Sequence, residues 1–165
     1  MGNKTIFNLI GPLSSPAQEK RQVIGVFDKK WMMPFAEALK ENNVVHAYIV
    51  HSQDGMDEIS PFAKTDIVEL KDGTISEFII DPKDLGISEG DKESLKGKNA
   101  DYNAEKIIDI YKGTSNEFSQ SVALNAAAGL IVSGKENDFK NAFEKVNKHL
   151  SSGKVFEHLT KLQSK

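Results

Sequence analysis

The sequence predicts an α/β domain in which a mainly parallel sheet, with one antiparallel hairpin, is flanked by helices. Three observations support this fold class. Two continuous apolar runs, residues 22–27 and 44–50, are rich in β-branched side chains, as expected of strands that are covered on both faces. An Asp-Gly pair at positions 72–73 lies between two further strand-like runs and is typical of a tight hairpin. From residue 100 onward the apolar residues recur at helical spacing.

A helical pattern separates the two apolar runs. Within residues 29–43 the apolar residues Trp31, Phe35, Ala36 and Leu39 recur near helical spacing. Pro34 comes early enough to be tolerated in a first turn. A strand, a helix and a second strand form a βαβ unit, so we expect these two strands to be parallel.

The rest of the chain is predicted in the same way. The hairpin should pair residues 65–70 with 75–80, and residues 81–99 should form a long polar surface connection with one short helical turn. Each predicted helix is closed by a glycine or lies near the chain end, and these helices occupy residues 101–113, 116–135, 138–153 and 155–163. The alanine-rich second helix is apolar almost all round and should be buried. Residues 5–11 form a short apolar segment, which we expect to follow upstream chain that would cover its other face.

Composition limits the classes of function. The 165 residues fit a single domain, and 39% hydrophobic with 27% charged residues is ordinary for a folded globular protein. The net charge of −3 and the dispersed basic residues do not favour nucleic-acid binding. No apolar run approaches the roughly 20 residues that span a bilayer, so no membrane partner is expected. The absence of cysteine excludes disulfides and agrees with a cytoplasmic protein.

An acidic turn follows the second apolar run directly. Asp54, Asp57 and Glu58 lie within five positions around Gly55. Such a turn is often only a solvated Asp-Gly turn. However, ligands of open α/β sheets bind beyond the carboxyl ends of the strands. In a turn Asp57 and Glu58 can converge and offer the oxygen ligands that Mg²⁺ accepts when substrate phosphates complete its coordination.

Other polar residues suggest less. Gly86–Gly90 matches G-x-S-x-G around Ser88, but no apolar strand precedes it and no helix follows, so a hydrolase nucleophile is not indicated. Asn125, within an apolar helix, is expected to tie down a neighbouring loop, because a buried amide needs partners. The four histidines lack zinc-site spacing. His46 is expected to be packed within a strand, and His149 and His158 to lie on solvated helix faces. His51, at the strand end beside the acids, is the one histidine worth testing for a function.

Several blocks together resemble the anthranilate phosphoribosyltransferase family. They are collinear and cover nearly the whole chain, at residues 4–17, 25–27, 44–60, 81–87 and 124–132. The resemblance implies the C-terminal α/β domain of the nucleoside phosphorylase/phosphoribosyltransferase type, which follows an N-terminal helical domain. It also implies a function in tryptophan biosynthesis, where the ribosyl 5-phosphate of phosphoribosyl diphosphate is transferred to anthranilate and diphosphate is released.

The resemblance also implies roles for particular residues. Asp57 and Glu58 match the family's Asp-Glu pair, which holds magnesium, so Mg²⁺ is the expected cofactor. Gly11 and Pro12 match the block that borders the anthranilate path. Little acid–base work is demanded of the protein in this mechanism, and no residue is assigned as catalytic; positioning and electrostatics should carry the rate.

The chain departs from the family pattern in three respects. The glycine-rich G-T-G-G-D loop that cradles the diphosphate is not in the sequence. The anthranilate-contacting arginine expected just before the family's L-G-[IV]-R-T block is missing too, because the sequence starts within that block as M-G-N-K-T, with Lys4 in the place of the block's own arginine. The N-terminal helices that form the family's homodimer are missing as well. We therefore expect residues 1–165 to be a single α/β domain fragment that is inactive alone.

Two alternative functions remain at this stage. One is a non-catalytic binding module on the same fold, which the dispersed charge does not favour. The other is a related nucleoside phosphorylase, which would use phosphate and a nucleoside. The Asp-Gly-Met-Asp-Glu block at residues 54–58 favours the transferase.

Overall fold

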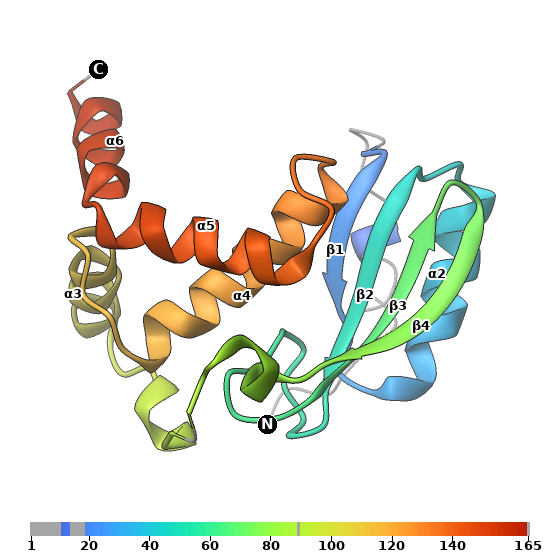
Figure 1. Ribbon diagram of the computed structural model, residues 1–165, viewed down its shortest axis with the longest axis horizontal. Coiled ribbons are helices and arrows are strands. Elements are labelled where there is room, and N and C mark those ends of the chain that lie inside the picture. The colour runs from blue at the N-terminus through green and yellow to red at the C-terminus, as the bar shows by residue number, and fades with distance from the viewer. Residues whose placement is uncertain (1–10, 14–18, 89, 165) are drawn as a thin grey trace.

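The computed structural model describes residues 11–13, 19–88 and 90–164, and it shows a four-stranded sheet with helices on both faces (Figure 1). The strands lie in the order β1-β2-β3-β4, which is also their order along the chain. Their bounds are Arg21–Gly25 for β1, His46–Ser52 for β2, Thr65–Lys71 for β3 and Thr74–Ile80 for β4. The predicted α/β class with flanking helices is confirmed.

The sheet is mixed, so the predicted mainly parallel sheet needs correction within the described residues. Strands β1 and β2 are parallel, with Gly25 opposite Val50, as the βαβ pattern predicts. The pairs β2–β3 and β3–β4 are antiparallel. The reason is the connection of residues 53–64, which contains no helix. A parallel return usually runs through a crossover helix, whereas a connection without one can bring the next strand back antiparallel.

The helix of the βαβ unit forms where its pattern predicts. A short 3-10 turn, η2 (Lys29–Trp31), leads into α2 (Met32–Glu41). The turn begins at Asp28, whose side chain accepts a hydrogen bond from the Lys30 backbone at 3.1 Å. Helix α2 covers one face of the sheet with its buried residues, which are Met32, Phe35, Ala36 and Leu39.

The predicted hairpin between β3 and β4 is confirmed. Asp72 and Gly73 both have positive φ, 48° and 79°. Two central residues with positive φ define the turn whose twist matches that of the flanking strands. Register is fixed by Lys71 opposite Thr74.

Strand β2 separates two apolar clusters. Ala47 and Ile49 point into the cluster that contains α2, whereas Tyr48 and Val50 point into the cluster that contains the later helices. Successive side chains of a strand alternate between faces, so a strand covered on both sides reads as a continuous apolar run. This explains why the run predicted a strand that is covered on both faces.

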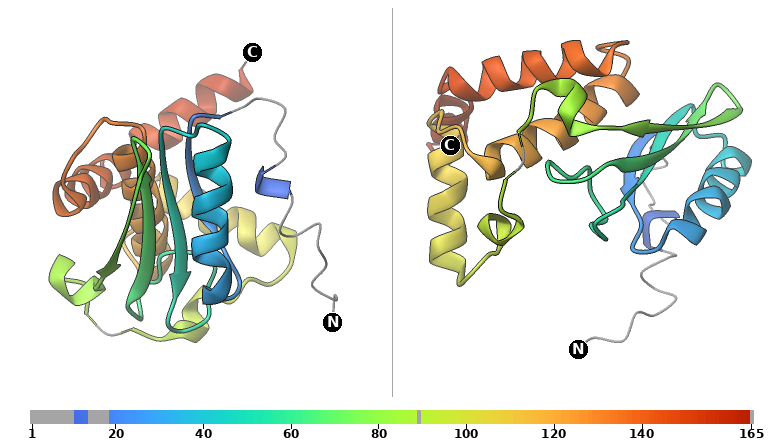
Figure 2. Two further views of the ribbon diagram at one scale, coloured as in Figure 1. Left: turned by 90° about the vertical axis from the view of Figure 1, so that its right-hand side faces the viewer. Right: turned by 60° about the horizontal axis from the view of Figure 1, so that its bottom comes forward.

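The four predicted C-terminal helices are all present. They are α3 (Ala100–Tyr111), α4 (Glu117–Val132), α5 (Phe139–Ser151) and α6 (Lys154–Gln163). Helix α4 packs against β1 and β2 on the face opposite α2, and α5 packs against α4 (Figure 2). As predicted for the alanine-rich helix, α4 has its most buried residues at Ala123, Leu124, Ala127 and Ala128.

The connection of residues 81–99 has two short 3-10 turns, η3 (Pro82–Leu85) and η4 (Lys92–Leu95), where one was predicted. The apolar segment 5–11 lies outside the described residues except for Gly11, which begins the 3-10 turn η1 (Gly11–Leu13). Among the helices of the described part of the chain, none is long and apolar enough to cross a membrane.

Candidate functional site

The acidic turn lies where the parallel strands β1 and β2 end. Residues 53–64 leave the carboxyl end of β2 and return to β3, and on the way the Asp57 carbonyl lies against Gly25, the last residue of β1. A cavity of about 510 Å³ opens at this end of the sheet, between the turn and helix α4. It is lined by Val23, Gly25, Val50, Asp57, Glu58, Ser121, Val122 and Asn125.

Asp57 and Glu58 both line this cavity. Partial burial raises the pKa of the Glu58 carboxyl, and the negative charge of Asp57 raises it further. A carboxyl responds in this way when it has lost solvent and a second anion lies nearby. The turn therefore brings two carboxylates into one electrostatic environment, although both residues as a whole remain exposed.

Asp54, the third acid of the turn, has a different task. Its Oδ1 accepts a hydrogen bond from the Met56 backbone at 3.2 Å, and its Oδ2 accepts one from Ser60 Oγ at 2.9 Å. Lys92 Nζ lies 3.5 Å from the same Oδ2. Partial burial would raise the pKa of Asp54, but the hydrogen bonds from Ser52, Met56 and Ser60 outweigh it and lower that pKa. Asp54 builds the turn instead of facing the cavity.

Asn125 connects helix α4 to the turn. Its side-chain Oδ1 accepts a hydrogen bond from the Ile59 backbone N–H at 3.0 Å, and its Nδ2 donates to the Ile59 carbonyl at 3.1 Å. The same Nδ2 donates to the carbonyl of Ser121 at 2.9 Å. The prediction that Asn125 ties down a neighbouring loop is confirmed, and the loop is the one that carries the acids.

Gly25 allows the turn to approach the end of β1. A Cβ added at Gly25 would lie 1.6 Å from the carbonyl oxygen of Asp57. No side chain fits at that distance, so this close approach requires glycine. Sequence reasoning did not assign a role to Gly25, because the contact joins residues 32 positions apart and only the folded chain shows it.

The histidines divide as the sequence suggests. His46 is buried and its Nε2 lies 2.7 Å from Glu69 Oε1, whereas His149 and His158 are exposed. The Nδ1 of His51 lies 2.8 Å from the Val26 carbonyl, which holds the segment after β1 against the end of β2. Ser88 is exposed in a loop between two short turns.

Gly11 and Pro12 form part of η1, which lies beside α2, and Leu13 of the same turn packs against the α2 cluster. Gly11 is exposed, and a Cβ added there would meet nothing within 4 Å. Among the described residues, the lining of the Asp57–Glu58 cavity does not include Gly11. The structure therefore does not join these two predicted sites in one cavity.

The described residues contain no group of three or more His, Asp or Glu side chains that could hold a metal ion by themselves. Two carboxylates are nevertheless the usual protein share of a magnesium site, because this ion keeps waters and binds substrate phosphates. The raised pKa of Glu58 beside Asp57 also fits, since a cation between two carboxylates relieves their repulsion. The donor set therefore fits a magnesium ion that a phosphate ligand also coordinates.

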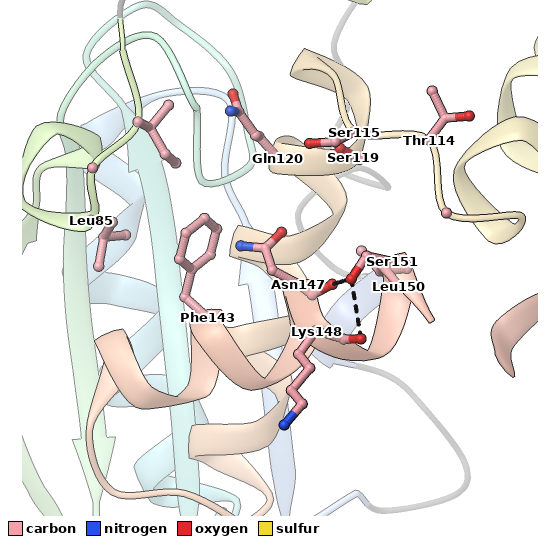
Figure 3. Close-up of a pocket in the computed structure, with 13 residues that line it drawn as sticks. Leu85, Thr114, Ser115, Ser119, Gln120, Phe143, Asn147, Lys148, Leu150 and Ser151 are labelled. Carbon is pink, nitrogen blue, oxygen red and sulfur yellow. Dashed lines mark hydrogen bonds between the residues drawn. The ribbon is translucent and has the colours of Figure 1, made fainter. Parts of the chain in front are cut away.

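A second cavity, of about 360 Å³, lies between the loop after η3, the start of α4 and helix α5 (Figure 3). Its polar lining includes Thr114, Ser115, Gln120 and Asn147. Sequence reasoning did not identify it, because its residues come from three separate segments and match no motif. It contains none of the acids of the turn.

The sequence is similar to those of anthranilate phosphoribosyltransferases. Residues 1–156 match the profile of the family described as "Glycosyl transferase family, a/b domain". The anthranilate phosphoribosyltransferase of Pelagibacter ubique is 53% identical over 164 residues, which are 99% of this chain and 50% of the relative. That of Azospirillum brasilense is 42% identical over 165 residues, or 98% of this chain and 46% of the relative. The chain thus spans about half the length of the curated relatives it matches.

Solved structures give the same result. A crystal structure of anthranilate phosphoribosyltransferase from Thermus thermophilus superposes with a TM-score of 0.85 at 31% identity, covering 97% of this chain and 47% of that one. The Saccharomyces cerevisiae enzyme in complex with PRPP and Mg has the same fold, with a TM-score of 0.84 at 23% identity, covering 96% of this chain and 46% of that one. The resemblance stated from the sequence is confirmed.

Proposed function

Because the chain belongs to the family described as "Glycosyl transferase family, a/b domain", we propose that it forms the metal-binding part of an anthranilate phosphoribosyltransferase. The proposed reaction transfers the phosphoribosyl group of phosphoribosyl diphosphate to the amine of anthranilate and releases diphosphate. One observation carries the proposal. Asp57 and Glu58 line a single cavity at the carboxyl ends of β1 and β2, where α/β sheets bind their ligands.

We propose that Asp57 and Glu58 hold Mg²⁺ in this cavity. The ion would supply neutralisation of the negative charge that collects on the departing diphosphate. The two carboxylates would hold that ion where the phosphate end of the substrate binds, and the apolar side chains of Val23 and Val50 line the cavity beside them. Positioning of this kind can account for much of a rate enhancement without an acid or a base from the protein.

The transfer also needs groups that bind the diphosphate and anthranilate. The 165 residues contain no glycine-rich phosphate loop. We propose that this loop and the contacts of a homodimer come from a further segment. That segment would correspond to the half of the relatives that residues 1–165 do not match. Gly11 and Pro12 are proposed to border the path of anthranilate, a role that the exposure of Gly11 allows.

The test uses the product of the complete gene. Its turnover with phosphoribosyl diphosphate and anthranilate should depend on Mg²⁺. The double variant Asp57→Asn/Glu58→Gln should lower kcat/KM by at least about 100-fold, a typical loss when charge stabilisation of the transition state is removed. A matched control is Asp101→Asn/Glu105→Gln, which removes the same charge from an exposed part of α3.

Two outcomes would contradict the proposal. If the Asp57→Asn/Glu58→Gln variant kept wild-type turnover and magnesium dependence, the acidic turn would be only a solvated turn. If the wild-type protein cleaved nucleosides with phosphate and did not use anthranilate, the phosphorylase alternative would replace the transferase. Equal losses in the control variant would indicate a general charge effect.

A further inference from the structure

We propose that Asn125 is a positioning residue, which fixes the direction of the Asp57–Glu58 carboxylates through the backbone of Ile59. The inference rests on the proposed function of those carboxylates. It adds a residue that lies on helix α4, 66 positions along the chain from the backbone it holds. The geometry of three hydrogen bonds supports it.

The amide of Asn125 is matched to a peptide group in both directions. It accepts from the N–H of Ile59 and donates to the carbonyl of the same residue, at 3.0 and 3.1 Å. An amide carries an acceptor and donors at one planar end, whereas an aliphatic side chain carries neither and a carboxylate only accepts. The remaining N–H of Nδ2 bonds the Ser121 carbonyl at 2.9 Å, which fixes the amide on its own helix.

The residue that Asn125 holds is itself immobilised. Ile59 is fully buried in the apolar cluster beneath α4. Glu58 is its direct neighbour and Asp57 is one residue further, so a change in the Ile59 backbone moves both carboxylates. On the other side of the turn, the Asp57 carbonyl rests against Gly25. The acidic pair is therefore held between the end of β1 and the middle of α4.

The free-energy cost of placing an amide in an apolar helix also indicates that Asn125 has a role at the turn. Helix α4 is otherwise apolar through its middle, where Leu124 and Ala127 are fully buried and Asn125 itself is half-buried beside the cavity. A polar group in such a helix lowers stability unless it is satisfied. The described partners of Asn125 outside its helix are both atoms of Ile59, next to the acids.

The test compares Asn125→Leu, which keeps the branched shape of the side chain without its polar atoms, with Ile131→Val, a core change on the same helix. Asn125→Ala serves as a second variant if leucine does not fit. Each variant of the complete gene product is assayed for turnover at increasing Mg²⁺ and, separately, for Mn²⁺ binding by electron paramagnetic resonance. Loss of Asn125 should weaken Mn²⁺ binding and raise the Mg²⁺ needed for half-maximal turnover by about 10-fold, the lower end of the effect of losing a group that hydrogen-bonds a metal ligand directly, because Asn125 acts one step further away, through the Ile59 backbone.

The outcomes separate this inference from the proposed function. If Asn125→Leu binds Mn²⁺ as Ile131→Val does, the positioning role is refuted even when Asp57→Asn/Glu58→Gln abolishes binding. If Asp57→Asn/Glu58→Gln leaves Mn²⁺ binding unchanged, the metal assignment fails, and any effect of Asn125 must have another cause. A loss of melting temperature shared by Asn125→Leu and Ile131→Val, with metal binding intact in both, would show a structural role alone.

Discussion

Two polar connections of this molecule look alike in sequence and are held in different ways. Residues 53–64 and residues 81–99 are both polar, contain glycine and follow strands. The first is tied to distant elements, by Asn125 of α4 and by the close approach of Gly25. The second is shaped by local turns, in which an aspartate side chain accepts a hydrogen bond from the backbone N–H two positions later. Its links to the first connection include ion pairs of exposed lysines, Lys64 with Asp81 at 3.2 Å and Lys92 with Asp54 at 3.5 Å.

The difference teaches how a loop becomes a site. A local cap fixes a turn but not its place relative to the sheet, whereas hydrogen bonds from another element fix both. Pre-organised groups of this kind are what a binding or catalytic site needs. The two connections also meet, because Lys92 of the second donates to the Asp54 carbonyl of the first at 2.7 Å.

Of the variants considered, Gly25→Ala should lower the free energy of unfolding most. It removes the close approach to β1 that distinguishes the first connection from the second. The new methyl group would fall on the Asp57 carbonyl oxygen, so the acidic turn must move away from β1. Overpacking costs about 1–3 kcal/mol of unfolding free energy, and the upper end is expected here because the clashing atom belongs to the backbone. Urea unfolding measures the loss, and the Mn²⁺ affinity of the complete gene product should fall with it.

Gly129→Ala is the matched control for that variant. Gly129 lies within α4 and an added Cβ meets nothing within 4 Å there. Alanine in a helix interior should stabilise the protein by roughly 0.5–1 kcal/mol. If both glycine variants changed stability in the same direction, the special role of Gly25 would be wrong.

Asp54→Ala is expected to have the next largest effect. It removes the acceptor of the fully buried Ser60 hydroxyl and of the Met56 backbone. A buried donor without a partner costs about 1–3 kcal/mol. The equivalent change in the second connection, Asp91→Ala, removes only a local cap and should cost about 0.5 kcal/mol. Urea unfolding of both variants would compare the two connections directly, and equal losses would contradict the contrast between them.

The contribution of Asp54 should also depend on pH. The folded state lowers the pKa of this carboxyl, so the folded protein favours its charged form. The stabilisation is therefore complete above the unfolded pKa, about 3.9, and is lost as the pH falls through the lower folded value. The stability difference between wild type and Asp54→Ala should accordingly shrink below about pH 4.

Much of the fold could be predicted, because its signals are local. The apolar run of β2, the Asp72-Gly73 turn and the helix spacings are properties of neighbouring residues. Asn125 could be predicted to hold a loop, since an amide in an apolar helix must find partners. The loop that it holds could not be predicted, because the sequence does not show which backbone group 66 residues away will become its hydrogen-bond partner.

Other features depend on the assembled chain. The antiparallel return from β2 to β3 depends on a loop path that apolar patterns do not encode. The need for glycine at position 25 arises from one carbonyl, and the second cavity from the meeting of three segments. The acidic turn could be proposed as a site from its place after a strand, but the separate task of Asp54 required the hydrogen bonds.

Glu58→Gln should change the free energy of unfolding least, and it should raise this free energy instead of lowering it. Burial and the charge of Asp57 raise the pKa of Glu58 in the folded protein. The folded state therefore favours the protonated form: this favourable contribution is present below the unfolded pKa, about 4.3, and is lost as the pH rises through the higher folded value. At neutral pH the neutral glutamine should raise stability by less than about 0.5 kcal/mol, because solvent screens so exposed a group.

Added Mg²⁺ should reverse the order of stability of the wild-type protein and Glu58→Gln. If Asp57 and Glu58 hold the ion, added Mg²⁺ stabilises the wild-type protein by mass action, whereas Glu58→Gln gains less because one ligand is lost. Thermal unfolding of the complete gene product with and without Mg²⁺ measures both effects. A variant that is more stable than wild type without the ion and less stable with it would show that the turn keeps a repulsive carboxylate pair for a cation. An equal response of the two proteins to Mg²⁺ would instead assign the raised pKa of Glu58 to burial and repulsion alone.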